Sequence, residues 1–348
     1  MSANEERAQI RQALQQRLLE VEEKLARLGD HVMTVTDEQL ESLLIRRGET
    51  LDIDGTFVDF GPRFFEPAIP PDGLAEFRQA VESHWFYQDE DPWNPGYRHL
   101  GWKPPCVYDE EYPGNSQCGR LATIECGQKR HGWMNSVLAH CSDGKHFGAE
   151  TEKKEYWEVI DTNRFEGWIH GYLPGFAELG PVCLARGDKL KFWYHYMSTW
   201  AYQFRTIDGP IQPHVAAAVF DSSVAEEDQV LRSEIATAMA LLRWQFHRKD
   251  FRKHHTLPSL VFSFQHDKFC RITQFHFDGQ RLILRPSRRL NLATNEPTDE
   301  AYHILRWMMT NPVGDTSLRE QPKEEEEDKE LERNLDHDPT NFPLKVQG

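Results

Sequence analysis

Cysteine and histidine side chains cluster between residues 118 and 146, in a glycine-rich stretch that predicts loops. Thiolate and imidazole groups are the ligands that tetrahedral zinc prefers. No C-x-x-C pair is present, and the adjacent His140 and Cys141 are poorly spaced to bind one ion. We therefore expect buried structural cysteines, surface histidines and no bound zinc. The residues that a zinc site would use are Cys118, Cys126, His131 and Cys141.

Acidic residues in the same region suggest a second chemistry, that of a divalent-metal nuclease. Such enzymes hold Mg²⁺ with an Asp and a Glu-x-Lys motif on neighbouring strands, and the Lys positions the attacking water. Asp143 precedes a Glu-Lys-Lys run at 152–154, and Glu125 ends a strand-like run. Residues 150–158, however, have the pattern of a charged helix, so the strand context is missing. The candidate catalytic residues are Glu125, His131 and Asp143.

The strong local motifs of nucleotide-binding and hydrolytic enzymes are absent from the sequence. It contains no G-x-x-x-x-G-K-[ST], G-x-G-x-x-G, G-x-S-x-G or H-E-x-x-H. Nucleotide-driven and serine-hydrolase chemistry therefore lack their usual signatures, although a catalytic triad need not be local in sequence.

Charge is distributed unevenly along the chain. The whole sequence has a formal net charge of −16, yet residues 232–289 contain 12 Lys and Arg against four Asp and Glu. A basic segment in an acidic protein creates a face that attracts anions, such as a nucleic acid. The alternative is that acidic residues elsewhere in the chain neutralise this face. The candidate polyanion-binding residues are Arg271, Arg281, Arg285, Arg288 and Arg289.

The first 48 residues predict a helical arm. Leu14, Leu18, Val21, Leu25 and Leu28 form a heptad-like apolar seam. We expect this helix to dock on the body, and the alternative is self-association as a coiled coil. A second helix follows, in which Thr36 and Gln39 form a capping box and Gly48 occupies the C-cap position. Deletion of residues 1–30 is expected to leave the body folded.

Residues 49–315 predict an α+β core. Its front half is rich in Pro, Gly, Trp and Tyr, and one helix follows Asp72. The clearest part is a helix–meander–helix unit at 223–310, which begins with a capping box of Ser223 and Glu226. Three strand-like runs follow at 260–265, 269–277 and 281–285, and a helix capped by Thr298 closes the unit. The fold class is therefore α+β, an antiparallel β-meander packed against amphipathic helices.

The third strand-like run makes a specific packing prediction. Leu282 and Leu284 share one face of the strand, whereas Arg281 and Arg285 share the other. We expect the leucine face to pack on the apolar stripe of the helix at 231–246, and both guanidinium groups to be solvated.

Residues 316–348 form an acidic tail. Between 318 and 340 the sequence has ten acidic and four basic residues, and such runs are usually disordered. The tail could dock on the basic segment of its own chain, so truncation after Pro312 is expected to raise the affinity for polyanions.

Composition limits the class of protein. Hydrophobic residues make up 39% of the 348 residues, which is enough for a packed core. The longest apolar run, Val215–Phe220, is too short for a membrane span, and the N-terminus does not resemble a signal peptide. Six cysteines do not indicate a disulfide framework. We expect a soluble intracellular protein, either cytoplasmic or nuclear, that has no contact with a membrane.

The segments 259–264 and 271–284 read SLVFSF and RITQFHFDGQRLIL. They make the last third of the chain similar to the C-terminal part of a loose group of filamentous-fungal proteins of unknown activity. The resemblance implies a fungal origin. It implies no activity and transfers no functional residue.

Three functional classes follow from the sequence. The first is an interaction or accessory protein without chemistry of its own, whose partner binds the N-terminal helix. The second is a nucleic-acid-binding or nuclease-like protein that uses the basic segment at 232–289. The third is a small-molecule enzyme with a pocket lined by the Trp- and Tyr-rich middle of the chain. The sequence identifies no cofactor.

Overall fold

The structure is a computed structural model of the chain. It describes residues 3–28, 32–56, 59, 61–88, 126–134, 137, 155–159, 196–206, 212–266, 268–278, 280–294 and 296–317. The acidic run predicted to be a disordered tail lies outside these residues.

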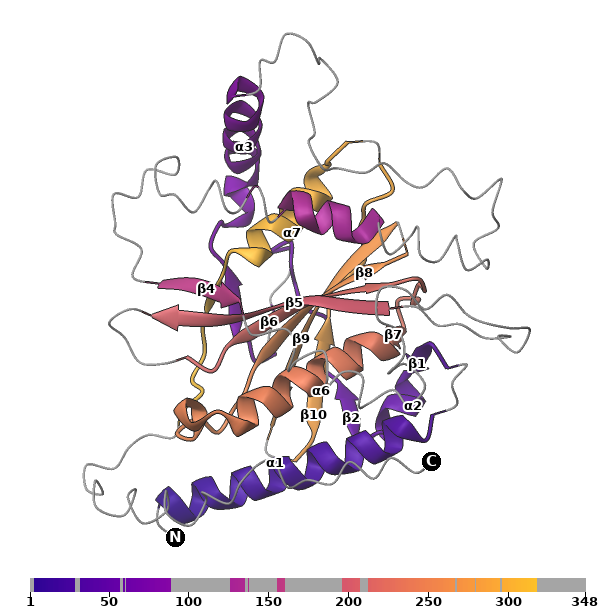
Figure 1. The fold of residues 1–348 in the computed structure, drawn as a ribbon, viewed down its shortest axis with the longest axis vertical. Coiled ribbons are helices and arrows are strands. Elements are labelled where there is room, and N and C mark those ends of the chain that lie inside the picture. The colour runs from indigo at the N-terminus through magenta and orange to yellow at the C-terminus, as the bar shows by residue number, and fades with distance from the viewer. Residues whose placement is uncertain are drawn as a thin grey trace.

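A mixed β-sheet forms the centre of the described structure (Figure 1). Its strands lie in the order β2-β10-β9-β8-β6-β5-β4, and β11 pairs with β9. Most neighbours are antiparallel, but β6 is parallel to β8 and β2 is parallel to β10. The strands are β2 (Ile45–Arg47), β4 (Glu155–Val159), β5 (Tyr196–Thr206), β6 (Val215–Asp221), β8 (Ser259–Gln265), β9 (Phe269–Phe277), β10 (Leu282–Pro286) and β11 (Leu290–Asn291).

Helices cover both faces of this sheet (Figure 1). The helices α1 (Ala3–Ala26), α2 (Asp37–Ser42) and α6 (Arg232–His247) lie on one face. The helices α3 (Leu74–Gln88) and α7 (Asp299–Met308) lie on the other, together with a helical stretch at 126–134. Alternate residues of β6 and β8 therefore enter different cores. Val261 packs against α6, whereas Leu260 and Phe262 pack on the side of α7.

The α+β prediction and the antiparallel meander are confirmed. Strands β8, β9 and β10 pair antiparallel in chain order, and Asp278 accepts backbone hydrogen bonds in the turn before β10. The leucine face of β10 lies in the same core as the stripe of α6, as expected. The unit also contains a feature that the sequence did not indicate. Strand β6 adds parallel to β8, so α6 is a crossover helix between two neighbouring strands.

The predicted start of α6 was wrong. Ser223 and Glu226 do not cap it; they lie in a loop that leads to the short strand β7 (Gln229–Leu231). Helix α6 begins at Arg232, and the Glu234 carboxylate accepts a hydrogen bond from the backbone N–H of Leu231 at 3.3 Å. A hydrophobic residue therefore precedes the helix, and the acid three residues later binds the free backbone donor.

The N-terminal helix docks on the body, as expected. Leu14, Leu18, Val21 and Leu25 are buried in the core that α6 and the sheet share. Helices α1 and α6 run antiparallel: Arg11 lies over the Phe246 ring at one end, and Arg232 donates to the Leu25 carbonyl at the other. The apolar seam is thus satisfied within one chain. Removal of residues 1–30 would expose this core, so we now expect the deletion to destabilise the body.

The second helix is capped as predicted, but it ends earlier. Thr36 and Gln39 form the capping box of α2, which follows the short strand β1 (Thr34–Thr36). Leu44, with φ of 64°, occupies the left-handed position that was assigned to Gly48. The chain then enters β2, which is the edge strand beside β10. The predicted arm therefore contributes a strand to the main sheet.

Shorter elements complete the fold. A 3-10 turn, η1 (Pro71–Gly73), precedes α3, and Thr298 stands at the N-cap of α7 without a side-chain cap bond. The strand β3 (Phe65–Pro67) pairs with β12 (Thr310–Pro312). The charged helix expected at 150–158 is wrong, because residues 155–159 form β4 against β5. No helix in the described part of the chain has the length and apolar character needed to cross a bilayer.

The burial of α1 gives the first testable prediction. Leu18→Ala and Leu25→Ala should each lower the free energy of unfolding by about 2–5 kcal/mol, because each empties a core position. Leu19 lies on the same helix with 43% of its surface exposed, so Leu19→Ala is a matched control that should cost at most about 0.5 kcal/mol. Urea denaturation of the three variants makes the measurement. Equal, small losses would mean that α1 is not part of the core.

Candidate functional site

The five arginines proposed from the sequence for polyanion binding form ion pairs with acidic groups elsewhere in the chain. Arg271 pairs with Glu234, Arg281 with Glu41, Arg285 with Asp59, Arg288 with Asp54 and Glu300, and Arg289 with Glu226 and Glu227. Acidic residues of the same chain therefore neutralise these five arginines, which is the alternative that we gave to polyanion binding.

Arg285 shows why its predicted solvation was wrong. Its side chain is 1% exposed, and it donates to Asp59, to the Pro62 carbonyl at 2.7 Å and to the Glu49 carbonyl at 3.1 Å. A Cβ on Gly61 would lie 2.6 Å from its guanidinium carbon, so this close approach requires glycine. The 49–63 segment, which lies over this face of the sheet, buries a strand residue that the sequence pattern placed in solvent.

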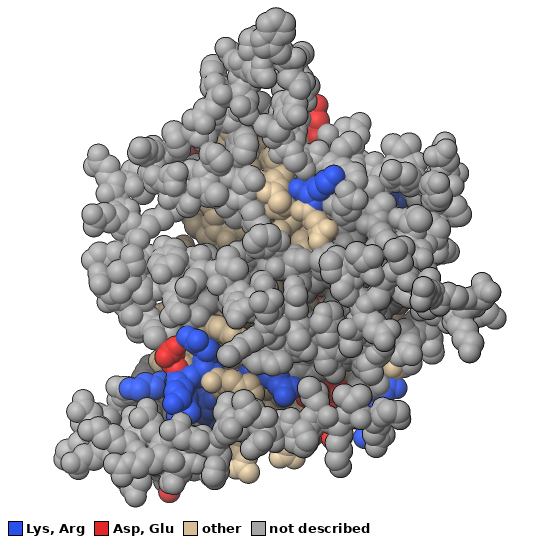
Figure 2. All heavy atoms as spheres, viewed as in Figure 1, with Lys and Arg blue, Asp and Glu red and all other residues tan. Residues whose placement is uncertain are grey.

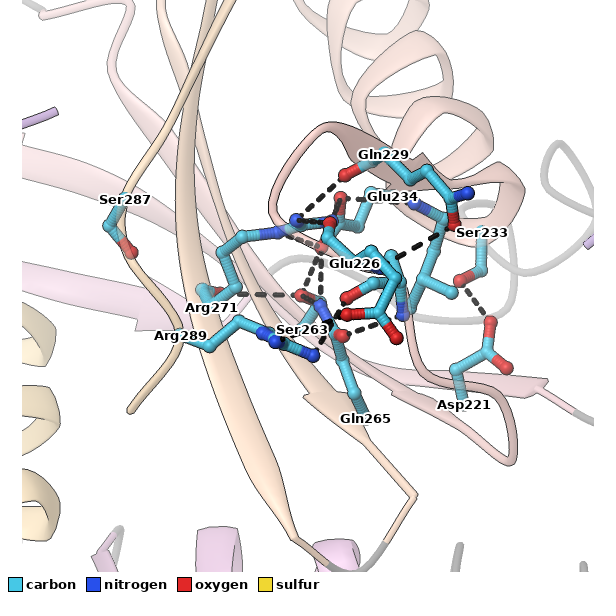
Figure 3. Close-up of polar contacts among 12 residues, drawn as sticks. Asp221, Glu226, Gln229, Ser233, Glu234, Ser263, Gln265, Arg271, Ser287 and Arg289 are labelled. Carbon is cyan, nitrogen blue, oxygen red and sulfur yellow. Dashed lines mark hydrogen bonds and ion pairs between the residues drawn. The ribbon is translucent and has the colours of Figure 1, made fainter. Parts of the chain in front are cut away.

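A polar network joins α6 to the central strands (Figure 3). The Glu234 carboxylate and the Arg271 guanidinium are both fully buried, and two hydrogen bonds of 2.8 and 3.1 Å join them. Ser263 and Gln265, on β8, donate to the same carboxylate. The Arg271 side chain also donates to the Gln229 carbonyl at 2.8 Å.

This network lies at the carboxyl ends of two parallel strands, where α/β sheets often bind ligands. Asp221 ends β6, and its carboxylate accepts hydrogen bonds from Ser233 and from the Ser223 backbone N–H. Glu234 and Asp221 thus already bind donors from the chain itself. We assign the network a structural role: it fixes the position of α6 against β8 and β9.

The candidate residues for metal binding and catalysis do not form a site in the described structure. His131 is buried on the 126–134 helix, edge-on against the stacked rings of Phe220 and Phe264, and Cys126 on the same helix is disulfide-bonded. Among the described residues, no three His, Cys, Asp or Glu side chains are placed to bind one metal ion. Cys118, Glu125, Cys141, Asp143 and most of the Trp- and Tyr-rich middle lie outside the described residues.

Basic residues that the sequence analysis did not single out gather at the C-terminal end of α6. Residues 243–255 contain five Lys and Arg against one acid, together with three histidines. Figure 2 shows Lys and Arg side chains clustered at the lower left, where Figure 1 places this end of α6 beside the start of α1. We call this cluster the basic surface. It consists of Arg11, Arg243, His247, Arg248, Lys249, Arg252, Lys253, His254 and His255.

Local structure explains why Lys249 and Lys253 face solvent. Phe251, in the 3-10 helix η3 (Lys249–Phe251), is fully buried against Trp244, with ring centroids 5.9 Å apart. This anchor turns its neighbours outward, and Lys249 and Lys253 are exposed. Positive charge at a helix C-terminus also interacts favourably with the helix dipole. The segment can therefore hold several cations on one surface.

The pKa shifts distinguish this surface from the paired arginines. Burial and the nearby Arg252 lower the pKa of Arg11 to about 10. Burial, Arg243 and Arg11 lower the pKa of His247. In contrast, hydrogen bonds to Asp54 and Glu300 raise the pKa of Arg288. Cations that lower the pKa of their neighbours indicate a local excess of positive charge.

Some of these cations pair with acids. Arg243 contacts Glu22 at 3.5 Å, and Arg248 donates to Asp250 at 2.6 Å. The Arg248–Asp250 pair is partly exposed, and pairs of this kind contribute little to stability and are weakened by salt. One feature of the sequence does indicate this basic surface, namely the run of charges between the end of a helix and the next strand. Connections of this kind are usually exposed, so their charges usually reach solvent.

Comparisons of the chain with protein-family models, with curated proteins and with solved structures gave no match.

The two arginines of β10 provide a direct test of this charge assignment. Arg285→Ala should destabilise the protein by about 3–5 kcal/mol, because it removes one of the two arginines that pair with the buried Asp59 carboxylate and also the donor to the Glu49 and Pro62 carbonyls. Arg281→Ala is the matched control, since this side chain is 49% exposed and its pair with Glu41 should contribute at most about 1 kcal/mol. Chemical denaturation compares the two variants. A cost for Arg281→Ala as large as that for Arg285→Ala would contradict the assignment.

Buried histidines predict that stability falls in acid. Burial lowers the pKa of His131 to about 3 and the pKa values of His214 and His276 to about 4, from an ordinary value of 6.5. Between pH 6.5 and about 4, the unfolded chain therefore binds protons that the folded chain does not. Each histidine should remove about 2 kcal/mol of stability when the pH falls from 7 to 5.

Urea denaturation at the two pH values measures this loss. His131→Phe keeps an aromatic ring against Phe220 and Phe264. It should reduce the loss of stability between pH 7 and pH 5 by the contribution of one histidine. An unchanged difference would mean that His131 is not buried in its neutral form.

Proposed function

We propose that this chain is an accessory protein without chemistry of its own, and that it binds nucleic acid through the basic surface. The observation that carries the proposal is the local excess of positive charge at the end of α6, where Lys249 and Lys253 are exposed. Closely spaced exposed cations suit the phosphates of a nucleic-acid backbone.

The acidic character of the whole chain does not prevent such binding. At physiological ionic strength, charges separated by more than about 8 Å are largely screened. A bound phosphate is therefore attracted mainly by the cations within reach, and the net charge of −16 contributes less. The net charge should still slow association at low salt, because screening is then weaker.

The aromatic rings of the basic surface suggest which part of the nucleic acid is contacted. Arg11 lies over the Phe246 ring at 4.6 Å, and Arg248 lies over the Trp244 ring at 5.3 Å. The ring face that each arginine covers is therefore not open for a base to stack on. Contacts should therefore go to phosphates, which position a nucleic acid without reading its sequence.

The proposal assigns no catalysis to the described residues, because their candidate acids and bases already have internal partners. Glu234 binds Arg271, Ser263 and Gln265. His131 lies against aromatic rings, and its lowered pKa keeps it neutral at pH 7. These groups stabilise the fold.

Charge reversal on the full-length chain tests the proposal. Lys249→Glu with Lys253→Glu should weaken binding to a fluorescent 20-base-pair duplex at about 50 mM salt by at least about tenfold, because two phosphate contacts become repulsive. The slope of log K against log[salt] should fall by about 1 for each lysine removed. Fluorescence anisotropy over a salt series measures both quantities.

Arg27→Glu with Arg46→Glu is the matched control. Both residues are exposed, they lie outside the basic surface, and the change in net charge is the same. This variant should bind within about twofold of the wild type, apart from the weak long-range effect of net charge. Equal losses in the two variants would refute the assignment to the basic surface. Duplexes of different sequence should bind equally well.

A further inference from the structure

Two arginines of the basic surface come from distant parts of the chain and meet where the start of α1 lies against the end of α6. The Arg11 side chain, on α1, donates to the Phe246 carbonyl in the last turn of α6. It also donates at 3.5 Å to the carbonyl of Phe251, the residue directly before Arg252. The Arg252 backbone N–H donates to the Lys249 carbonyl at 3.2 Å, so its position is fixed as well.

The two guanidinium groups are close enough to repel each other. Burial and the charge of Arg252 lower the pKa of Arg11 to about 10. Arg11 is still protonated at pH 7, so both side chains carry a positive charge there. A neighbouring cation makes the charged form of a group less stable. An anion that contacts both guanidinium groups removes this repulsion, and its binding is therefore favoured.

No acid in the described part of the chain pairs with Arg252. Asp250 is the one acid between positions 243 and 255, and it accepts a hydrogen bond from Arg248 at 2.6 Å. The strand arginines differ in this respect, because Arg271 and Arg285 are buried in ion pairs. An anion that approaches Arg252 therefore has no described carboxylate to displace.

Both side chains have N–H donors to offer to an anion. A guanidinium group has several donors in a planar fork, and Arg11 uses its two terminal nitrogens to bind the Phe246 and Phe251 carbonyls. Arg11 and Arg252 are half-buried, so each reaches solvent. The Phe246 ring, 4.6 Å from Arg11, further restricts that guanidinium. A fork held in this way matches the oxygen atoms of a phosphate group.

Arg11 also changes the electrostatics of the helix end. The last carbonyl groups of a helix carry partial negative charge, which by itself repels an anion. Arg11 binds one of these carbonyls, that of Phe246, and adds a full positive charge beside it. The C-terminal end of α6 can therefore accept an anion as long as α1 is docked on it.

We propose that Arg11 and Arg252 form a phosphate-binding site between α1 and the end of α6. Its ligand is a phosphate group, either free or in the backbone of a nucleic acid. The nucleic-acid source rests on the proposed function, whereas the site itself rests on the positions and charges of the two side chains. Because one arginine comes from α1, phosphate binding here depends on the docking of that helix.

Inorganic phosphate tests the site without any nucleic acid. It is titrated into the full-length chain at pH 7 and about 20 mM salt, where screening is weak, and NMR follows the arginine Nε–H signals. The signals of Arg11 and Arg252 should shift together with one dissociation constant. Those of Arg17 and Arg281, which contact Glu20 and Glu41, should not shift. Equal shifts in all four arginines, or with chloride at the same ionic strength, would overturn the site.

Two substitutions test which residues hold the phosphate. Arg252→Gln and Arg11→Gln should each weaken phosphate binding at least about tenfold, because one of two charged donors is lost. If Arg11→Gln does not fold, Arg252→Gln decides alone, since its side chain forms no hydrogen bond with the described residues. Arg27→Gln removes the same charge from an exposed position outside the basic surface, so it is the matched control and should change binding less than about twofold. Equal losses in Arg252→Gln and Arg27→Gln would overturn the site.

The 20-base-pair duplex then identifies the source of the phosphate. Arg252→Gln should weaken duplex binding about tenfold at about 50 mM salt and lower the salt slope by about 1. Selective phosphate shifts without any effect of Arg252→Gln on duplex binding, or without duplex binding at all, would support a site for free phosphate alone. Duplex binding that depends on Lys249 and Lys253, with no phosphate shift and no effect of Arg252→Gln, would support the proposed function and overturn the site.

Discussion

The central sheet is covered by helices on both faces, and the rest of the structure depends on this constraint. A polar side chain on an inner strand cannot reach water, so it needs a partner inside the protein. Arg271 on β9 meets Glu234 on α6, and Arg285 on β10 meets Asp59. Gln274 on β9 donates to the Pro62 carbonyl and accepts from the Phe64 backbone N–H.

These partners come from segments far away in the sequence, and they fix how those segments lie on the sheet. A buried ion pair contributes little net stability, because desolvation offsets most of the Coulomb attraction. Its loss is costly, however, so a register that separated Glu234 from Arg271 would be unfavourable. We infer that these pairs determine the position of α6 and of the 49–63 segment more than they add to the stability of the fold.

The same constraint leaves solvent-exposed charge at the ends of the elements. Positive side chains on the inner strands are neutralised internally, whereas those after α6 lie in a connection that reaches solvent. Phe251 holds this connection to the core, and Thr316 is held beside it through His254 and His255. The basic surface and the origin of the acidic tail are therefore neighbours in the fold, although about 60 residues separate them in the sequence.

The sequence by itself determined the features that depend on local contacts. The capping box of Thr36 and Gln39, the turn at Asp278 and the meander from β8 to β10 all involve residues close together in the chain. The leucine face of β10 also followed from the two-residue period of a strand, since Leu282 and Leu284 lie in the core with α6. The docking of α1 followed from its apolar seam.

The tertiary structure alone decided the long-range pairings and the fate of the charges. The run Val215–Phe220 could be read as apolar, but its parallel pairing with β8 depends on a crossover that no local pattern encodes. The burial of Arg285 could not be predicted from local sequence patterns either. Periodicity places Arg285 on the face opposite the leucines, but it cannot show that residues 49–63 cover that face. Whether an arginine is a binding residue or an internal ion-pair partner depends on which distant carboxylate reaches it, and only the folded chain brings the two together.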